Sequence, residues 1–374
     1  MRLPEGGSAL TLETTADRID ADLRALSGWA GIRELEIHVD RSPSLDALVR
    51  LPRLEALTVH IDTPDEAVSI AALTRLGRLR RVVLAGVPLR SLAPVAHLDG
   101  LEYLDISDTG VETLESLRGL RQLRVLAASR NPLRDLRALA GKTGLRALYL
   151  DGVELGVVDD SIAAIGTLRT LQILDLSGVA LEDVAPLRGC VALESLALDG
   201  ASIRNPAALG ALEALVELDL PGVQSYDFAW LSSLGALESL RLEGSNLSSS
   251  TPLSSLRRLE NLDLESTGLT EVRGLAPLTR LESLDLSHTA VADLSPLGQL
   301  VALRDVDLSA SPVDDISAFA AMSHLRWLRL DQTRVRDLGP LAGALGLEWL
   351  SLRGTQVGDS RALSGLASLR VVRD

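Results

Sequence analysis

The sequence contains very few cysteine, lysine and aromatic residues. Cys190 is the one cysteine among 374 residues, Lys142 is the one lysine, and aromatic residues make up 2% of the chain. A single cysteine excludes an internal disulfide framework and any zinc site built from several cysteines. Because Cys190 stands where neighbouring copies of the repeat described below have leucine, we predict that it is a buried core residue.

The sequence also lacks long apolar runs and an excess of positive charge. No stretch approaches 18 apolar residues, and the first residues lack the apolar run of a secretory signal, so the default prediction is a cytoplasmic location. Acidic residues number 51 and basic residues 37, which gives a formal net charge of -14. This balance argues against binding to nucleic acid or to an anionic membrane, and it allows a protein partner with a basic surface.

Common catalytic motifs are absent as well. The sequence has no GxSxG, no HExxH and no glycine-rich dinucleotide fingerprint, and its five histidines are scattered. Gly141-Lys142-Thr143 resembles the end of a phosphate loop, but Leu136 stands where such a loop requires its first glycine. We therefore expect no enzyme activity and no cofactor.

Leucine, in contrast, recurs at regular intervals. The segment LESLDLSHTAVADLSPLGQL, which starts at Leu281, has the pattern L-x-x-L-x-L-x-x-T-x-V followed by x-D-L-S-P-L-x-x-L. Its first leucine recurs every 22 residues, and the series extends back to Ile32. Two steps are longer, at 25 residues after Leu54 and 26 residues after Leu145. A fixed period of this length predicts a repeat solenoid.

These repeats resemble the leucine-rich repeat family, in particular its 22-residue class, as in bacterial internalins and the leucine-rich regulatory subunit of protein phosphatase 1. The resemblance covers nearly the whole chain. It implies an α/β repeat fold: a right-handed leucine-rich-repeat solenoid, or horseshoe, with a concave parallel β-sheet and short helical or 3-10 turns on the convex side. It implies much less about function, because this fold serves many purposes.

The residue chemistry of single repeats agrees with this fold. In Leu284-Asp285-Leu286, alternation sends both leucines into the core and Asp285 toward solvent, as in a half-buried strand. The two long repeats carry their extra residues in the convex segment. We predict a helix in each, over residues 63–76 (TPDEAVSIAALTRL, with a Thr-x-x-Glu capping box) and residues 157–168 (VVDDSIAAIGTL).

The ninth position of the repeat is polar in some copies and apolar in others. It holds Thr or Ser at residues 109, 245, 267, 289, 311, 333 and 355, Asn at residue 131, and Val or Ala at residues 87, 153, 179, 201 and 223. A hydroxyl can bond to a backbone group of the turn, whereas valine cannot. We therefore expect the turns of the valine-containing copies to be paired by backbone groups or by water.

The chain divides into two predicted regions. Residues 1–31 form an N-terminal cap or a degenerate first repeat, and residues 32–374 hold fifteen full leucine-rich repeats and a partial sixteenth. In the first region Ile19, Leu23, Leu26 and Trp29 are predicted to share one helical face. The last repeat of a solenoid exposes an apolar face, so we expect a partner, a second copy of the chain or a further domain to cover the C-terminal end.

Two His-x-Asp pairs, His38 with Asp40 and His60 with Asp62, occupy the seventh and ninth positions of adjacent repeats. Register places the pairs about 5 Å apart on neighbouring strands. The favoured interpretation is structural: both aspartates accept backbone N–H groups, and both histidines lie at the rim of the concave face. The alternative is a metal site with these four ligands, which have suitable chemistry.

Carboxylates and two tryptophans mark the predicted concave face, where the third, fifth and seventh positions project. Like charges stacked about 5 Å apart repel by roughly 1 kcal/mol in water, so the aspartates either serve solubility or await a cationic partner. Trp327 and Trp349 share the third position of adjacent repeats. They either cover the sheet near its open end or form a binding hot spot. The predicted partner-binding residues are Trp327, Trp349, Arg329, Arg353, Asp331, Asp307, Asp285, Asp263, Asp219, Asp175, Tyr149 and Tyr103.

The function predicted from these features is that of a protein-binding scaffold or adaptor that recognises a partner on its concave face. An alternative is the sensor or autoinhibitory portion of a larger bacterial regulator, which such repeats also resemble. A more distant alternative is a metal-dependent hydrolase that uses the two His-x-Asp pairs.

Overall fold

The computed structural model describes the chain apart from residues 1–7, 27, 30, 156–157 and 374. The earliest part of the predicted N-terminal cap and the first residue of the predicted 157–168 helix therefore lie outside the described residues. The chain forms two compact units. Unit 1 comprises Met1–Ala180 and Gly189–Leu193, and unit 2 comprises Leu181–Arg188 and Glu194–Asp374.

Unit 1 contains a parallel sheet in which each strand pairs with the next strand along the chain. The strands β1, β2 and β3 have six residues each, and the later strands have three. The strands are β1 (Ala9–Thr14), β2 (Glu34–Val39), β3 (Ala56–Ile61), β4 (Arg81–Val83), β5 (Tyr103–Asp105), β6 (Val125–Ala127), β7 (Ala147–Tyr149) and β8 (Ile173–Asp175).

Unit 2 repeats the same arrangement, again with parallel pairing of consecutive strands. Its strands are β9 (Ser195–Ala197), β10 (Glu217–Asp219), β11 (Ser239–Arg241), β12 (Asn261–Asp263), β13 (Ser283–Asp285), β14 (Asp305–Asp307), β15 (Trp327–Arg329), β16 (Trp349–Ser351) and β17 (Arg370–Val372). From β9 to β16, equivalent positions of adjacent repeats are Cα partners, as with Ser283 and Asp305, so side chains at one repeat position form a column across these strands. The register of β17 is shifted by one residue, since Trp349 pairs with Arg370 and not with Val371.

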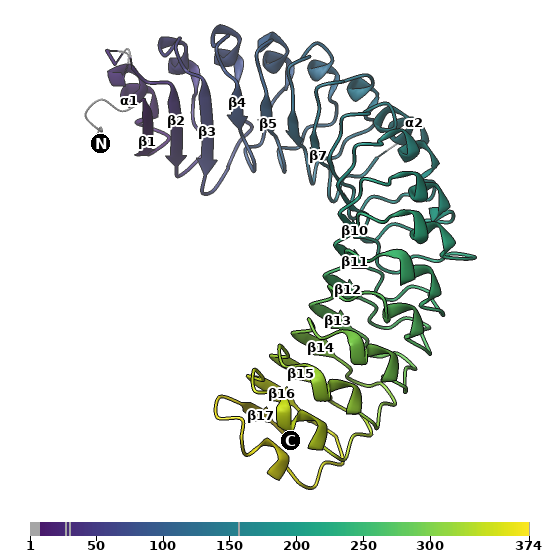
Figure 1. Ribbon diagram of the computed structural model, residues 1–374. Coiled ribbons are helices and arrows are strands. Elements are labelled where there is room, and N and C mark those ends of the chain that lie inside the picture. The colour runs from purple at the N-terminus through teal and green to yellow at the C-terminus, as the bar shows by residue number, and fades with distance from the viewer. Residues whose placement is uncertain (1–7, 27, 30, 156–157, 374) are drawn as a thin grey trace. The chain divides into compact units, whose positions relative to one another are not determined.

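Short 3-10 helices lie on the side of each coil opposite the strands (Figure 1). They are η1 (Asp46–Arg50), η2 (Ala71–Arg75), η3 (Ala93–His97), η4 (Glu115–Leu117), η5 (Arg137–Leu139), η6 (Ala185–Gly189), η7 (Pro206–Ala211), η8 (Ala229–Ser233), η9 (Thr251–Ser255), η10 (Arg273–Leu275), η11 (Ser295–Gln299), η12 (Ser317–Ala321), η13 (Gly339–Gly343) and η14 (Arg361–Leu363). The α-helices of the described residues are α1 (Ile19–Leu26) and α2 (Val158–Ile165). None of the helices in the described part of the chain has the length and apolar character needed to cross a bilayer.

Apolar side chains at fixed repeat positions fill the core between the strands and the 3-10 helices. Leu284 and Leu286 are 1% and 0% exposed, while Asp285 between them is half-buried on the outer side of the sheet. Leu297 of η11 is also fully buried and closes the same repeat from the opposite side. The predicted leucine-rich-repeat fold, with a parallel sheet on one side and short helical turns on the other, is therefore confirmed in both units. We call the solvent-facing side of the strands the sheet face.

One of the two predicted insertion helices is wrong. The helix predicted over residues 157–168 is confirmed as α2, but residues 63–76 form only η2 after an irregular segment. Ser42 of the preceding repeat accepts hydrogen bonds from the N–H groups of Asp65 (3.2 Å) and Glu66 (3.1 Å). Thr63 donates its hydroxyl to the Asp40 carbonyl instead of capping a helix. The backbone groups that would start the helix are thus bonded to a neighbouring repeat.

The N-terminal helix is shorter than the sequence predicts. Ile19, Leu23 and Leu26 of α1 are all fully buried, which confirms their shared face. Trp29 lies beyond the end of α1 and is 43% exposed, so its predicted place on that face is wrong. The helix ends at Leu26, whose carbonyl accepts a hydrogen bond from the Trp29 N–H at 2.9 Å in the following turn.

The ninth position behaves as its chemistry predicts. Asn131 is 2% exposed, and its Oδ1 accepts hydrogen bonds from the N–H groups of Thr109 (3.1 Å) and Val111 (3.0 Å). In the copies with Val87, Val153 and Val179 the turn closes through backbone groups, as with the Val179 N–H donating to the Leu176 carbonyl at 3.0 Å. The prediction of backbone pairing is confirmed in these three copies, and their valine side chains lie in the core.

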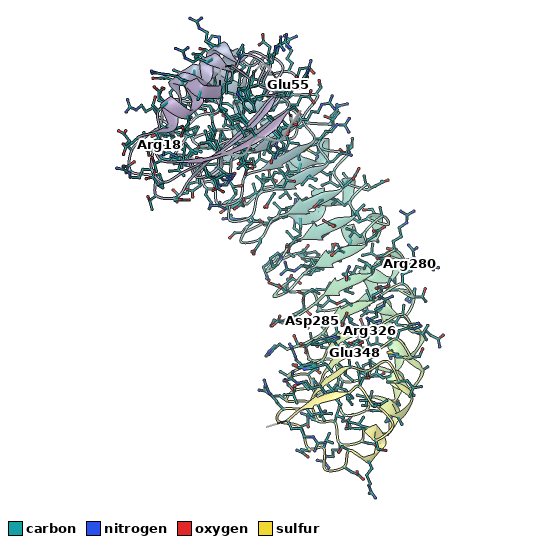
Figure 2. The ribbon with its side chains drawn as sticks, turned by 90° about the vertical axis from the view of Figure 1, so that its left-hand side faces the viewer. Arg18, Glu55, Arg280, Asp285, Arg326 and Glu348 are labelled. Carbon is teal, nitrogen blue, oxygen red and sulfur yellow. The ribbon has the colours of Figure 1, made fainter. Side chains whose placement is uncertain are left out.

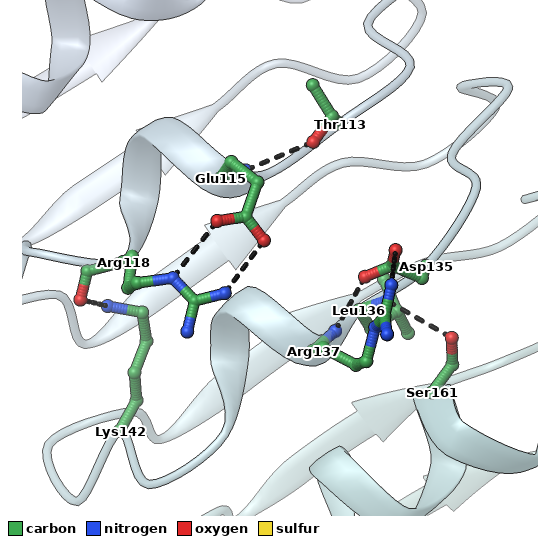
Figure 3. Close-up of polar contacts among 8 residues, drawn as sticks. All are labelled: Thr113, Glu115, Arg118, Asp135, Leu136, Arg137, Lys142 and Ser161. Atoms are coloured by element: carbon green, nitrogen blue, oxygen red, sulfur yellow. Dashed lines mark hydrogen bonds and ion pairs between the residues drawn. The ribbon is translucent and has the colours of Figure 1, made fainter.

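The sole lysine and the sole cysteine both serve the core of unit 1. Lys142 is 7% exposed and donates to the carbonyl oxygens of Leu117 (2.7 Å) and Leu120 (2.9 Å), with a longer contact to Arg118 (Figure 3). Its ammonium group therefore caps the 3-10 segment of the preceding repeat. Cys190 is fully buried as predicted, and burial raises the pKa of its thiol to about 11. Such a thiol is inert rather than nucleophilic at neutral pH.

Candidate partner-binding surface

The two predicted tryptophans lie side by side on the sheet face of unit 2. Trp327 of β15 and Trp349 of β16 are Cα partners, and their rings stack with centroids 5.2 Å apart at an interplanar angle of 27°. Trp327 is 48% exposed, and Trp349 is half-buried. Parallel pairing brings these residues together because both occupy the third position of their repeats.

A hollow of about 210 Å³ adjoins this tryptophan pair. Its walls come from the sheet face of β13, β14, β15 and β16. The lining residues include Ser283, Asp285, Asp305, Asp307, Trp327, Arg329 and Trp349. The hollow therefore combines aromatic surface, carboxylates and one guanidinium within a single depression.

Arg329 connects the acidic and aromatic parts of the hollow. Its Nη1 lies 2.7 Å from Oδ2 of Asp307, which is its neighbour in the fifth-position column. Its guanidinium carbon also lies 5.4 Å from the ring centroid of Trp349, within the range of a cation–π contact. Arg329 thus makes attractive contacts with both Asp307 and Trp349.

The predicted fifth-position aspartates hold the turns that follow their strands. The Oδ1 atoms of Asp175, Asp263, Asp285 and Asp307 accept the backbone N–H group two residues later, at 2.8–3.0 Å. Asp285 is labelled among the side chains drawn in Figure 2. Part of each carboxylate therefore has a structural role, which the sequence analysis missed although its signal was present in the regular spacing from aspartate to the turn.

Burial raises the pKa of several carboxyl groups in unit 2. It does so for Asp263 and Asp285, where a neighbouring carboxylate of the same column raises the pKa further. Burial also raises the pKa of Asp305, against the effect of Arg304. The ionised forms of Asp285 and Asp305, which both line the hollow, are thus less favourable than those of exposed aspartates.

Asp219 shares this pattern but has a cationic neighbour. Burial raises its pKa, while Arg241 of the adjacent strand opposes the shift. Arg241 Nη1 lies 2.8 Å from Asp219 Oδ2, and its Nη2 lies 2.9 Å from Glu243. Arg241 is therefore a cationic partner within the chain itself for Asp219 and Glu243.

Asp331 and Arg353, also predicted as partner-binding residues, contact each other. Asp331 Oδ1 accepts hydrogen bonds from the Arg353 backbone N–H at 2.7 Å and from the Ser351 hydroxyl at 2.5 Å. The contact uses the backbone of Arg353, and its side chain is exposed. Asp331 thus stabilises the turn after β16, next to the tryptophan pair.

The two predicted tyrosines of unit 1 are not brought together. Tyr103 of β5 is at the third position of its repeat, Tyr149 of β7 is at the fifth position of its repeat, and β6 lies between these strands. Arg81 covers the Tyr103 ring, with its guanidinium carbon 3.7 Å from the centroid. Arg81 was not among the predicted partner-binding residues, but the register of β4 and β5 places it beside Tyr103.

The histidines of the two His-x-Asp pairs meet, but their aspartates do not join them. His38 and His60 are Cα partners on β2 and β3, and their rings stack with centroids 4.6 Å apart. Glu36, which the sequence analysis missed, lies between them and has a lowered pKa, mainly through its hydrogen bond to His38. Asp40 instead accepts the Ala16 N–H at 2.8 Å, which agrees with the structural interpretation for that residue.

Comparison with known proteins supports the fold. The sequence matches no family model and no curated protein. Among solved structures, a leucine-rich-repeat protein of Leptospira interrogans is 18% identical, with 98% of this chain and 93% of that chain covered and a TM-score of 0.84. An internalin (InlF) of Listeria monocytogenes is 22% identical, with 81% and 82% covered and a TM-score of 0.64.

A third similar structure is the plant peptide hormone receptor RGFR1 in complex with RGF2. It is 15% identical, with 94% of this chain and 75% of that chain covered and a TM-score of 0.51. Identities this low establish shared architecture rather than shared activity. By its repeats, its parallel strands and its structural neighbours, this chain has the leucine-rich-repeat fold that is also found in bacterial internalins.

Proposed function

We propose that this chain is a protein-binding scaffold that holds its partner on the sheet face of unit 2, with Trp327 and Trp349 as the anchor. The observation that carries this proposal is the stacked tryptophan pair, in which Trp327 is 48% exposed, beside a hollow of about 210 Å³. Monomeric proteins seldom expose large aromatic side chains in clusters, and Trp and Arg are enriched among the residues that dominate binding energy. One structural neighbour, RGFR1, was solved with RGF2 bound.

The chemistry of the hollow indicates which kind of partner it fits. Asp285 and Asp305 line it, and burial makes their ionised forms unfavourable. A cationic group placed there would relieve this cost, while an apolar group would pack against the indole rings. The proposed partner therefore presents a lysine or arginine next to an apolar side chain. We also propose a cytoplasmic location, in keeping with a chain that has one buried cysteine and no disulfide.

Affinity capture from a lysate of the organism that encodes the chain tests this proposal. The baits are the wild-type chain, the double variant Trp327→Ala/Trp349→Ala, and the control Trp29→Ala, which removes a similarly exposed tryptophan from unit 1. Quantitative mass spectrometry should show a partner that is enriched with the wild type and the control and lost with the double variant. A partner retained equally by all three baits would refute the proposed anchor.

A further inference from the structure

Strands β1, β2 and β3 of unit 1 carry a group of side chains that the proposed scaffold function does not use. Their register places Glu13, His38 and His60 in one row across the three strands, and Thr11, Glu36 and Thr58 in the adjacent row. Because side chains alternate along a strand, Glu36 and His38 project from the same face of β2. The stacked histidines and Glu36 therefore converge on one point of the sheet face.

Two of the three distances within this group match those between metal ligands, and the ligand atoms of all three residues lie within 4.8 Å of one another. Glu36 Oε1 lies 3.1 Å from His38 Nε2 and 3.3 Å from His60 Nε2. Ligand bonds of 2.0–2.1 Å in a tetrahedral zinc site place neighbouring ligand atoms about 3.3 Å apart. The three side chains are 42–45% exposed, so an ion can reach them directly from solvent. A small shift of three exposed side chains would thus replace their hydrogen bonds with metal bonds.

We propose that Glu36, His38 and His60 form a binding site for a divalent transition-metal ion, with Zn²⁺ as the best match. Two imidazole nitrogens and one carboxylate oxygen are ligands that Zn²⁺ accepts, and they differ from the all-oxygen sets of Ca²⁺ and Mg²⁺. Among the described residues, this is the one group of three or more potential ligands with suitable spacing. Glu13, beside His38 in the register, is placed to supply a fourth ligand directly or through water.

The aspartates of the His-x-Asp pairs are not part of the proposed site. Asp40 Oδ1 accepts the Ala16 N–H, and Asp40 Oδ2 lies 3.7 Å from Nε of Arg41. Asp62 follows β3 and is exposed. The carboxylate of the proposed site is thus that of Glu36, two residues before His38. Asp40, two residues after His38, does not take part.

Metal titration of the full-length, tag-free and metal-free chain tests the proposal. Isothermal titration calorimetry with Zn²⁺ should show one equivalent bound. Co²⁺, used as a spectroscopic probe, should give the visible absorption of a four-coordinate ion that Zn²⁺ then displaces. His38→Gln, His60→Gln and Glu36→Gln should each weaken Zn²⁺ binding by about 100-fold or more, since even residues that only orient a ligand typically contribute 10–100-fold.

Two controls separate this site from general surface binding of metal. His97→Gln removes another exposed histidine of unit 1, and Asp40→Asn removes the alternative carboxylate. Both variants should bind Zn²⁺ like the wild type. Because all three proposed ligands are exposed, their variants should fold normally, and circular dichroism of the metal-free proteins checks this directly.

Three results would overturn the proposal. The first is the absence of saturable Zn²⁺ binding to the wild type below about 1 mM. The second is unchanged binding in folded His38→Gln and His60→Gln variants, and the third is loss of binding in Asp40→Asn with Glu36→Gln unaffected. None of these outcomes bears on the tryptophan pair, which the capture experiment tests separately.

Discussion

Two neighbouring parts of unit 2 use the same strand positions in opposite ways. On β12, β13 and β14 the fifth position is aspartate, and its carboxylate bonds to the turn of its own repeat. On β15 and β16 the fifth position is arginine or serine, and the third position is tryptophan. The aspartates of the first part are bonded within their own repeats, whereas the second part presents Trp327, whose side chain is 48% exposed. Exposure on a repeat surface is therefore weak evidence of a binding site until the internal hydrogen bonds have been assigned.

The largest expected difference between the two parts is in their contribution to partner affinity. With the captured partner in hand, Trp327→Ala and Trp349→Ala should each weaken its affinity by at least about 30-fold, or about 2 kcal/mol, as is typical of hot-spot residues. Asn261→Ala changes the same third position on β12, where the side chain is exposed, and should alter affinity by less than about twofold. Titration calorimetry measures all three. If Asn261→Ala and the tryptophan variants lose the same affinity, the tryptophan pair is not the main contact of the partner.

The next effect concerns stability at the junction of the two parts. Asp307→Ala removes the acceptor of the Ser309 N–H and the partner of Arg329, so unfolding free energy should fall by about 2 kcal/mol. Asp307→Asn keeps an oxygen for the Ser309 N–H and should cost less than about 1 kcal/mol. Urea denaturation of the two variants compares these values. If both variants lose the same stability, the turn contact is not the main contribution of this aspartate.

The smallest expected effect is a change in folding stability whose sign and pH dependence follow from the pKa of Asp285. Burial raises the pKa of Asp285 above its ordinary value of 3.8, so its ionised form destabilises the folded state at neutral pH. Asp285→Asn keeps the oxygen that accepts the Ser287 N–H, and should raise stability at pH 7 by about 1 kcal/mol. As pH falls through the raised pKa, the folded wild type takes up its proton first, and this advantage should disappear.

Asp293 provides the matched control for this pH dependence. It lies in the same repeat and is exposed, and its hydrogen bond from Ser295 lowers its pKa below the ordinary value. Its ionised form therefore stabilises the folded state, and that contribution is lost as pH falls through the lowered pKa. Asp293→Asn should accordingly destabilise at neutral pH, with the difference shrinking in acid. The same sign of effect in both variants would contradict the burial argument.

The fold and part of the candidate site could be predicted from the sequence. The 22-residue period of leucine was sufficient for the solenoid, because a repeat that cannot bury its apolar face alone must stack on its neighbours. The same register correctly placed Trp327 beside Trp349 and His38 beside His60. The sequence pattern predicted a helix in both long repeats. Only the second forms one, α2 at Val158–Ile165, because the backbone of Asp65 and Glu66 in the first is bonded to Ser42 of the preceding repeat.

The sequence by itself determined which residues share a column, because parallel strands of equal spacing must place equivalent positions side by side. Only the tertiary structure decided what each column residue contacts. Asp285 bonds to its own turn, Arg329 pairs with Asp307, and Glu36 lies between two histidines. These contacts depend on side-chain direction and burial to within an ångström, since hydrogen bonds and metal bonds act only at short range, whereas the repeat pattern specifies position only to the nearest strand.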